Sequence, residues 1–226
     1  PEWMISDLSI MLSGGVTVPA YTTYTERDYE YIIDDCTPTI IFVSNRTQYE
    51  KIINIIPKKD FIKKIFFFEN VKNIDEKLNL RIQDIFKRNN SNKKNFFDLK
   101  IQRSNMACII YTSGTQGKPK GVMLSHGGIL NNCEGAYELL KTFISKKPKF
   151  LTWLPLSHSY EHTVQFVQIV VGARVFYAES IDKLIKNMSD CSPEIMTAVP
   201  RFYQNLHQKI NVSFSKATGL KKFLIK

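Results

Sequence analysis

The sequence predicts an α/β protein in which helices cover both faces of a largely parallel β-sheet, a layered αβα arrangement. Short runs of β-branched and aromatic residues alternate with amphipathic stretches of helical length. The strand-like runs are apolar throughout, without the alternation that a sheet with one face in water shows. No internal repeat occurs, which excludes a solenoid.

The first part of the chain alternates strand and helix three times. Thr25 and Asp28 form a capping-box pattern at the start of the first helix, and Pro57 is expected to end the second. The predicted elements are a strand at 15–21, a helix at 25–36, a strand at 39–44, a helix at 46–56, a strand at 63–69 and a helix at 74–88.

A polar stretch then interrupts the pattern, and we expect a loop at 89–104 to join two lobes, residues 1–88 and 105–226. Ser125 is the expected N-cap of a long helix that reaches about Lys146. The remaining predicted elements are strands at 106–111 and 121–125, followed by strand and helix segments at 149–156, 173–179, 181–190 and 195–199.

Composition narrows the classes of function. The 226 residues carry a formal charge of +10, but no zinc-finger spacing or aromatic-basic signature accompanies the lysines, so no nucleic-acid partner is expected. The four cysteines stand singly, which indicates reduced thiols and a cytoplasmic location. No apolar run has the length of a membrane span, and peripheral contact with a membrane stays open.

The stretch YTSGTQGKPKG, residues 111–121, follows a buried strand and concentrates glycines, hydroxyls and lysines. Glycines permit backbone turns that expose successive N–H groups, and such a concave row binds anions. A phosphate chain is the ligand that uses N–H groups, hydroxyls and cations together. Gly114 and Gly117 are too close for a Walker loop and a strand-like run follows, so a P-loop NTPase is excluded. The dinucleotide pattern GxGxxG is likewise absent.

The stretch YTSGTQGKPKGVMLSH resembles the phosphate-binding signature of the adenylate-forming enzymes, which include acyl-CoA synthetases. The stretches PEWMISDLSIMLSGGVTVPAYTTYTERDYEYIIDD, WLPLSHSYEHT and MTAVPRFYQNL are similar to parts of long-chain fatty-acid–CoA ligases. One departure is Gln116, where the family usually has Thr or another small residue. The resemblance implies that residues 1–226 are an incomplete N-terminal adenylation domain without the C-terminal small domain.

In that family a fatty-acid carboxylate attacks the α-phosphate of ATP, and the acyl group then passes from the adenylate to coenzyme A. The resemblance implies the co-substrates ATP, fatty acid and coenzyme A, with Mg²⁺ as cofactor. It assigns the β- and γ-phosphates to a set of loop residues, with Thr112 also near Mg²⁺, and Lys118 is expected to be a solvated rim charge. The phosphate-binding set is Thr112, Ser113, Gly114, Thr115, Gly117 and Lys120.

His158 is the candidate catalytic residue, because the resemblance places it near the acyl carboxylate and the α-phosphate. A histidine hydrogen-bonded at a loop corner is the structural alternative. The stretch HSYEH also matches an inverted zincin motif, with His158 and His162 as zinc ligands and Glu161 as base. Pro155 and the shortage of a third ligand argue against zinc; only Glu179 and Glu194 remain as glutamate candidates.

Three residues are candidates for an acyl pocket, namely Trp153, Tyr160 and Gln165, although aromatic residues at such spacing are more often core. Arg201 matches a family motif and is expected to have a structural role. Because later family segments that bind adenine and supply an acidic Mg²⁺ ligand are missing, we expect no ligase activity from this chain alone. A complementing C-terminal segment is a candidate partner, and a non-catalytic nucleotide-binding module stays the alternative function.

Overall fold

The computed structural model describes residues 1–71, 79–82, 99–112 and 118–215. These residues divide into two compact units, each of which is built from two separate stretches of chain. The first contains Pro1–Thr142 and Pro155–Val170, and the second contains Phe143–Leu154 and Val171–Lys226. The predicted joining loop at 89–104 falls largely outside the described residues, so the division into lobes 1–88 and 105–226 stays a prediction.

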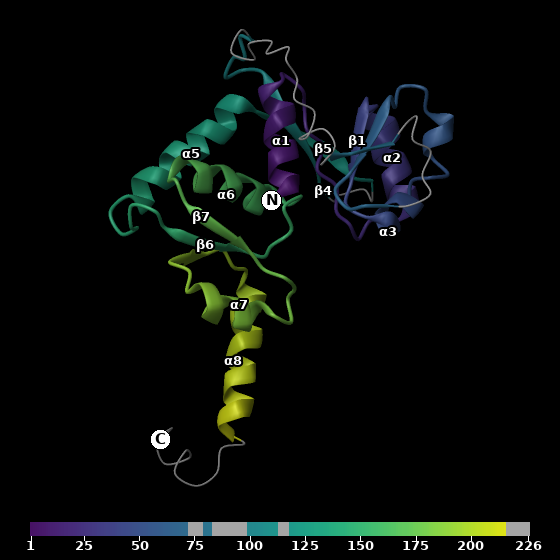
Figure 1. The fold of residues 1–226 in the computed structure, drawn as a ribbon. Coiled ribbons are helices and arrows are strands. Elements are labelled where there is room, and N and C mark those ends of the chain that lie inside the picture. The colour runs from purple at the N-terminus through teal and green to yellow at the C-terminus, as the bar shows by residue number, and fades with distance from the viewer. Residues whose placement is uncertain (72–78, 83–98, 113–117, 216–226) are drawn as a thin grey trace. The chain divides into compact units, whose positions relative to one another are not determined.

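The first unit contains a parallel three-stranded sheet in the order β1-β2-β3 (Figure 1). Its strands are β1 (Ile40–Val43), β2 (Lys64–Phe67) and β3 (Asn79–Arg81). The core beneath β1 and β2 contains the nearly inaccessible Ile65 and Phe67, whereas Phe66 and Phe68 of the same aromatic run are partly buried and lie against Phe42. The parallel pairing confirms the prediction of an α/β fold with a largely parallel sheet.

An antiparallel hairpin, also in the first unit, is the exception to this parallel arrangement. It consists of β4 (Met106–Thr112) and β5 (Lys120–Ser125), and both strands were predicted. Tyr111 and three of its neighbours in β4 are buried, whereas β5 is largely exposed. The loop at 113–117 therefore joins strand to strand, as the sequence predicts.

Helices of the first unit begin where the sequence supplies caps. In α2 (Glu26–Cys36), the Thr25 side chain accepts from the Asp28 N–H and Asp28 accepts from the Thr25 N–H, so the predicted capping box is confirmed. In α5 (His126–Leu140), Ser125 accepts from the Gly128 N–H, as predicted, although the helix ends before Lys146. The remaining helices are α1 (Glu2–Leu12), α3 (Arg46–Glu50), the 3₁₀ helix η1 (Ile56–Lys58) and α6 (Ser159–Val170).

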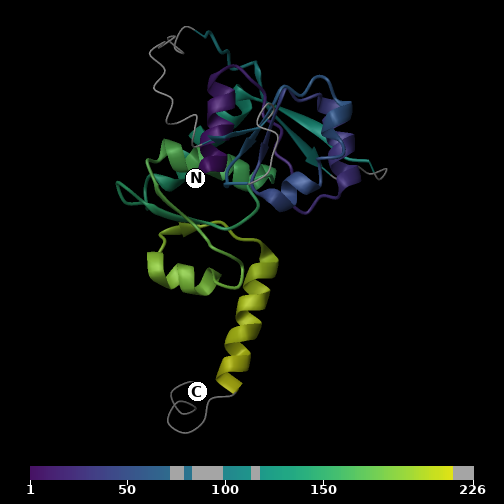
Figure 2. The ribbon, with the colours of Figure 1, turned by 45° about the vertical axis from the view of Figure 1, so that its right-hand side comes forward.

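The second unit contains a parallel sheet in the order β7-β6-β8, with α7 packed against β6 (Figures 1 and 2). Leu151 and Leu184 are nearly inaccessible in its core, and Trp153 packs against that cluster. Its elements are β6 (Lys149–Thr152), β7 (Arg174–Tyr177), α7 (Leu184–Cys191), β8 (Ile195–Met196) and α8 (Pro200–Ser215).

Helices α2 and α7 stop in the same way. The C-cap residues Thr37 and Ser192 have left-handed backbone angles, with φ of 42° and 46°. Each is followed by a proline, Pro38 or Pro193, which lacks an N–H group and cannot extend the helix. The end of α2 is thus followed by β1, and the end of α7 by β8.

Three predicted elements are wrong in the structure. The strand at 15–21 is a single bridge between Thr17 and Cys108, because Pro19 interrupts the run of N–H donors. The helix at 46–56 ends at Glu50 and continues as turns whose N–H groups bond three or four residues back. Within the predicted helix at 74–88, Asn79–Arg81 form β3.

No helix within the described ranges combines the length and apolar character needed to cross a bilayer. All four cysteines are free thiols in the structure.

Candidate functional site

The hairpin β4–β5 places two of the predicted phosphate-binding residues opposite one another. Thr112 and Lys120 are the last partners in the register, and both are exposed at the end of the hairpin. The other predicted phosphate-binding residues, Ser113, Gly114, Thr115 and Gly117, lie outside the described residues, so their role stays a prediction. The exposed Thr112 hydroxyl and Lys120 ammonium group at the loop end of the hairpin are suited to an anionic ligand.

Two side chains of helix α2 contact this hairpin, one beside each strand. The Tyr31 hydroxyl donates to the backbone carbonyl of Pro119 at 3.1 Å. The Tyr111 hydroxyl donates to Oδ2 of Asp35 at 2.5 Å. Burial, and then the hydrogen bond to Asp35, raises the pKa of Tyr111, so the phenol stays protonated and keeps its role as donor.

His158 lies in the loop that leads into α6 and is exposed. Its backbone N–H donates to the Pro155 carbonyl at 3.0 Å, and its Nδ1 accepts from the Tyr160 N–H at 3.2 Å. Because Nδ1 accepts, the neutral ring carries its proton on Nε2 and can donate from that atom. The hydrogen-bonded loop corner considered as the structural alternative is thus present, and it leaves a donor on the exposed ring.

His162 is buried and has a different environment. Its Nε2 lies 2.8 Å from Oδ2 of Asp7, and the ring meets the edge of Trp3. Its neighbour Glu161 is fully buried and accepts from Nε2 of Gln165 at 3.3 Å. The zinc interpretation of HSYEH gains no support, because His158 is exposed whereas His162 and Glu161 are buried. Within the described part of the chain, no group of three His, Cys, Asp or Glu side chains could hold a metal ion.

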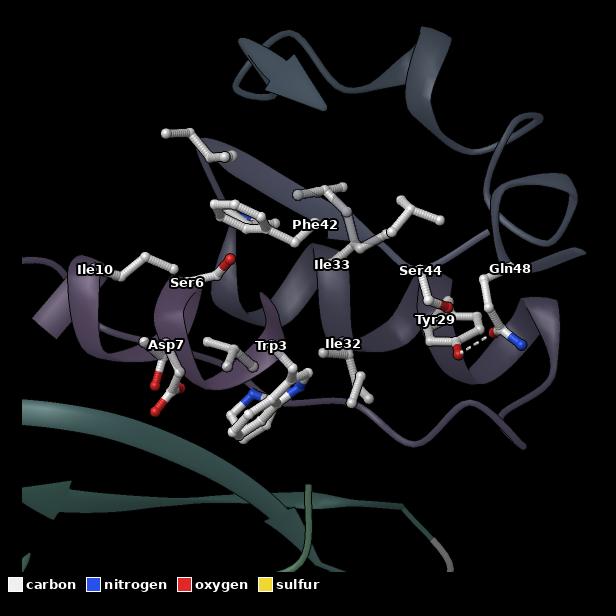
Figure 3. Close-up of a pocket in the computed structure, with 18 of the residues that line it drawn as sticks. Trp3, Ser6, Asp7, Ile10, Tyr29, Ile32, Ile33, Phe42, Ser44 and Gln48 are labelled. Atoms are coloured by element: carbon white, nitrogen blue, oxygen red, sulfur yellow. Dashed lines mark hydrogen bonds between the residues drawn. The ribbon is translucent and has the colours of Figure 1, made fainter. Parts of the chain in front are cut away.

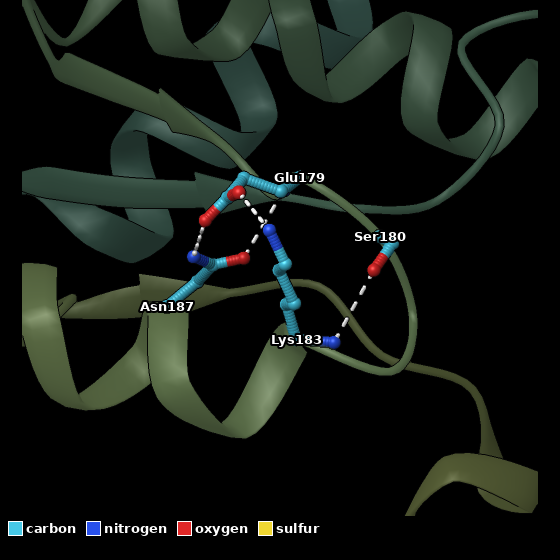
Figure 4. A network of polar contacts seen from close by, with 4 residues as sticks. All are labelled: Glu179, Ser180, Lys183 and Asn187. Carbon is cyan, nitrogen blue, oxygen red and sulfur yellow. Dashed lines mark hydrogen bonds and ion pairs between the residues drawn. The ribbon is translucent and has the colours of Figure 1, made fainter.

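The two glutamates considered as third zinc ligands have their own partners in the second unit. Figure 4 shows Glu179 accepting from Lys183 Nζ at 2.5 Å and from Asn187 Nδ2 at 3.1 Å. Glu194 accepts from the backbone N–H and the hydroxyl of Ser145, at 3.0 and 2.8 Å. Both carboxylates therefore hold neighbouring segments of the second unit together through hydrogen bonds.

The candidate acyl-pocket residues differ in their surroundings. Trp153 packs on Phe202 and donates from Nε1 to the Thr197 carbonyl at 2.6 Å, which is the environment of a core residue. Tyr160 is half exposed, and Gln165 is 1 % exposed. The structure therefore gives Trp153 the core role that the sequence favoured.

A cavity of about 270 Å³ lies elsewhere in the first unit, between α1, residues 16–22, α2 and β1 (Figure 3). Its lining is mostly apolar, with Trp3 and Asp7 at one side and the Tyr29 hydroxyl 3.0 Å from Gln48 Oε1 at the other. Thr112, Lys120 and His158 are absent from its lining. The predicted phosphate site is consequently an exposed hairpin end and not this cavity.

Sequence reasoning missed Asp7, Asp35 and the contact of Tyr31 with the hairpin. A signal existed for Asp7, because a carboxylate within the apolar helical stretch MISDLSIML requires a buried partner. No local signal existed for the α2 contacts, since their partners lie 76 and 88 residues apart in the sequence.

Curated proteins similar to this chain are long-chain acyl-CoA synthetases. Long chain acyl-CoA synthetase 4 of Arabidopsis thaliana is 31 % identical over 99 % of the chain, which covers 35 % of that protein. A long-chain-fatty-acid–CoA ligase of Rattus norvegicus is 30 % identical over 98 % of the chain, again covering 35 % of the relative. The chain thus spans about a third of the length of these relatives.

Solved structures with the same fold include a red-emitting luciferase of Phrixothrix hirtus, with a TM-score of 0.75 and 18 % identity over 88 % of this chain and 39 % of that one. ATP-bound MatB of Rhodopseudomonas palustris has a TM-score of 0.66 and 22 % identity over 91 % of this chain and 38 % of that one. The family model described as "AMP-binding enzyme" matches residues 1–225. By sequence and by fold, the chain belongs to the AMP-binding enzyme family.

Proposed function

We propose that this chain forms the triphosphate-binding part of an AMP-forming long-chain fatty-acid–CoA ligase. The observation that carries the proposal is the pairing of Thr112 with Lys120 at the loop end of the β4–β5 hairpin, directly beside residues 113–117. The chain's similarity to long-chain acyl-CoA synthetases supports the substrate class, which is a fatty acid together with ATP and coenzyme A.

The reaction has two steps. A carboxylate oxygen of the fatty acid attacks the α-phosphorus of ATP, and the bond to the β-phosphate oxygen breaks to release pyrophosphate. The coenzyme A sulfur then attacks the acyl carbonyl, which forms the thioester and releases AMP, while the thiol proton passes to solvent. The carboxylate is already ionised at neutral pH, so positioning and neutralisation of charge supply most of the catalysis.

The residues of this chain would bind different groups of the substrates. The Thr112 hydroxyl, the Lys120 ammonium group and the donors of Ser113, Gly114, Thr115 and Gly117 would bind the β- and γ-phosphates, and so stabilise the charge that develops on pyrophosphate. The Nε2–H of His158 would donate to the α-phosphate or to the fatty-acid carboxylate. Lys118, which is exposed and unassigned, serves as a matched control for Lys120.

Magnesium fits this donor set at Thr112. Mg²⁺ takes oxygen ligands and usually retains several waters beside the substrate phosphates, so one neutral hydroxyl from the protein is compatible with its chemistry. Bound there, it would neutralise phosphate charge. Thr112 would orient the cation, and the nucleotide would supply most of its ligands.

The direct test is to measure the affinity of the 226-residue chain for MgATP by isothermal titration calorimetry. Lys120→Ala should weaken binding about tenfold, the usual effect of losing one charge-assisted hydrogen bond, and Thr112→Ala should weaken it less. Lys118→Ala should leave the affinity close to that of the wild type. Equal losses in Lys118→Ala and Lys120→Ala would show that only general positive charge is involved and would contradict the proposed site.

Turnover distinguishes a ligase part from a non-catalytic nucleotide-binding module. The chain alone is expected to bind MgATP without forming acyl-CoA from palmitate and coenzyme A. Addition of a segment that corresponds to the C-terminal part of the relatives should restore thioester formation. Acyl-CoA formation by the isolated chain would contradict the first expectation, and binding that no added segment converts into turnover would favour the non-catalytic module.

A further inference from the structure

Two side chains of α2 reach the hairpin at positions that flank the predicted phosphate loop. Tyr31 and Asp35 are four residues apart, so they lie on the same face of the helix. Tyr31 contacts Pro119, which directly precedes β5, and Asp35 contacts Tyr111, which directly precedes Thr112. One rigid helix therefore holds both sides of the hairpin, each next to a predicted phosphate-binding residue.

The hairpin is shaped to let Tyr111 make this contact. Tyr111 pairs in register with Gly121 across the two strands. A Cβ atom at Gly121 would lie 3.3 Å from Cζ of Tyr111 and 2.8 Å from Cγ2 of Ile109, closer than side chains normally approach. The glycine thus leaves room for the phenol ring against β5, from where its hydroxyl reaches Asp35.

Helix α2 is itself well fixed at both ends. The reciprocal bonds of Thr25 and Asp28 close its N-terminus, and the left-handed Thr37 closes its C-terminus. Ile32 and Ile33, on the helix between Tyr31 and Asp35, are buried. Because side chains on a packed and capped helix keep their direction, Tyr31 and Asp35 can transmit a defined position to the hairpin.

We propose that Tyr31 and Asp35 are positioning residues for triphosphate binding, which act through Pro119 and Tyr111 to fix the spacing of the two ends of the phosphate loop. The proposal rests on the function proposed above. Several groups must contact neighbouring phosphate oxygens at the same time. A shift of either strand therefore lowers the affinity for the triphosphate, even though no contact with the ligand is removed directly.

The test compares MgATP affinity with stability in matched variants. Tyr111→Phe and Tyr31→Phe each remove only a hydroxyl, and each should weaken MgATP binding by up to about fivefold, the limit in which the whole net contribution of that intramolecular hydrogen bond is coupled to ligand binding. Asp35→Ala should weaken binding to a similar extent, whereas Asp35→Asn retains an oxygen acceptor and should restore most of the affinity. Tyr137→Phe, at an exposed position of α5, is the control and should bind as the wild type does.

A double variant tests whether Tyr111 and Asp35 affect MgATP binding through the same contact. Tyr111→Phe combined with Asp35→Ala should bind no more weakly than either single variant, because both changes break the same contact. Wild-type affinity in Tyr31→Phe and Tyr111→Phe at unchanged melting temperature would overturn the positioning role and leave the proposed function intact. Absence of MgATP binding by the wild-type chain would overturn the proposed function and the positioning role with it.

If Tyr111→Phe does not fold, Tyr31→Phe decides the question alone, since Tyr31 is only half-buried and its substitution leaves the hairpin interior unchanged.

Discussion

The Nε2 atom of His162 lies 2.8 Å from Oδ2 of Asp7, and the two side chains are 2 % and 4 % exposed. Asp7 belongs to α1 and His162 to α6, so this contact joins helices 155 residues apart in sequence. The ring of Trp3 meets the imidazole edge-on at a centroid distance of 5.4 Å. Both polar groups are withdrawn from water, and each depends on the other for a partner.

Asp7→Ala should lower the free energy of unfolding by about 3 kcal/mol, because it leaves the imidazole of His162 buried without its partner. Urea unfolding followed by circular dichroism measures the change. Asp60→Ala, at an exposed position of the same unit, is the control and should change stability by less than about 0.5 kcal/mol. An equal effect of the two substitutions would show that the buried pair contributes nothing specific.

Thr25→Ala should destabilise α2 by about 1 kcal/mol, since it removes the hydroxyl that accepts from the Asp28 N–H group. Thr25→Ser keeps the hydroxyl and should remain close to the wild type. Chemical denaturation of the three proteins provides the comparison. If Thr25→Ser is destabilised as much as Thr25→Ala, the threonine methyl group and not the cap is responsible.

The stability of the second unit should depend on pH through Glu194. The hydrogen bond from the Ser145 N–H, assisted by the Ser145 hydroxyl, lowers the pKa of Glu194 below its ordinary value of 4.5. A lowered folded-state pKa means that the carboxylate stabilises the unit above pH 4.5 and loses this effect as the pH falls through the folded-state pKa. The melting temperature of Glu194→Gln should therefore approach that of the wild type on acidification.

Fluorescence of Trp153 in a Trp3→Phe background reports on the second unit, because these are the two tryptophans of the chain. Melting curves between about pH 6 and pH 3 cover the relevant transition. Glu50→Gln, at an exposed position of the first unit, should leave the pH profile of Trp153 unchanged. A constant difference between Glu194→Gln and the wild type across this range would contradict the predicted role.

The thiols of the first unit should react slowly in the native chain. Burial raises the pKa of Cys108 to about 12 and that of Cys36 to about 11, so little thiolate is present near neutral pH. Alkylation by iodoacetamide at about pH 8, followed by mass spectrometry, should be at least about a hundredfold slower than in denaturant. Cys36 should react before the fully buried Cys108, and the reverse order would contradict the packing of β4.

The sequence predicts those parts of the fold that have a local cause. Continuous apolar runs identified β1, β2, β4 and β5, and polar side chains at helix starts identified Thr25 and Ser125 as caps. The segment containing β3 was misassigned because LNLRI fits two periods. Its apolar residues suit a helix in the wider window, but they also alternate with polar ones, which is the pattern of a strand.

The candidate site was predictable only in part. The composition of residues 111–121 pointed to phosphate, and the hairpin register that pairs Thr112 with Lys120 agrees with a loop between two strands. The contacts of Tyr31 and Asp35 could not be predicted, because they join distant segments through two hydroxyl groups that leave no periodic pattern in the sequence. Long-range polar contacts of this kind depend on tertiary packing.

The order in which the two units use the chain constrains how they can be made. Strand β6 occupies the centre of its sheet, but it is synthesised before α6, which completes the first unit, and before both of its neighbours β7 and β8. A nascent chain must therefore keep an apolar central strand unpaired while a helix of the other unit emerges. For the same reason no single proteolytic cut can release either unit whole, and any division of the gene for separate expression would need three breakpoints.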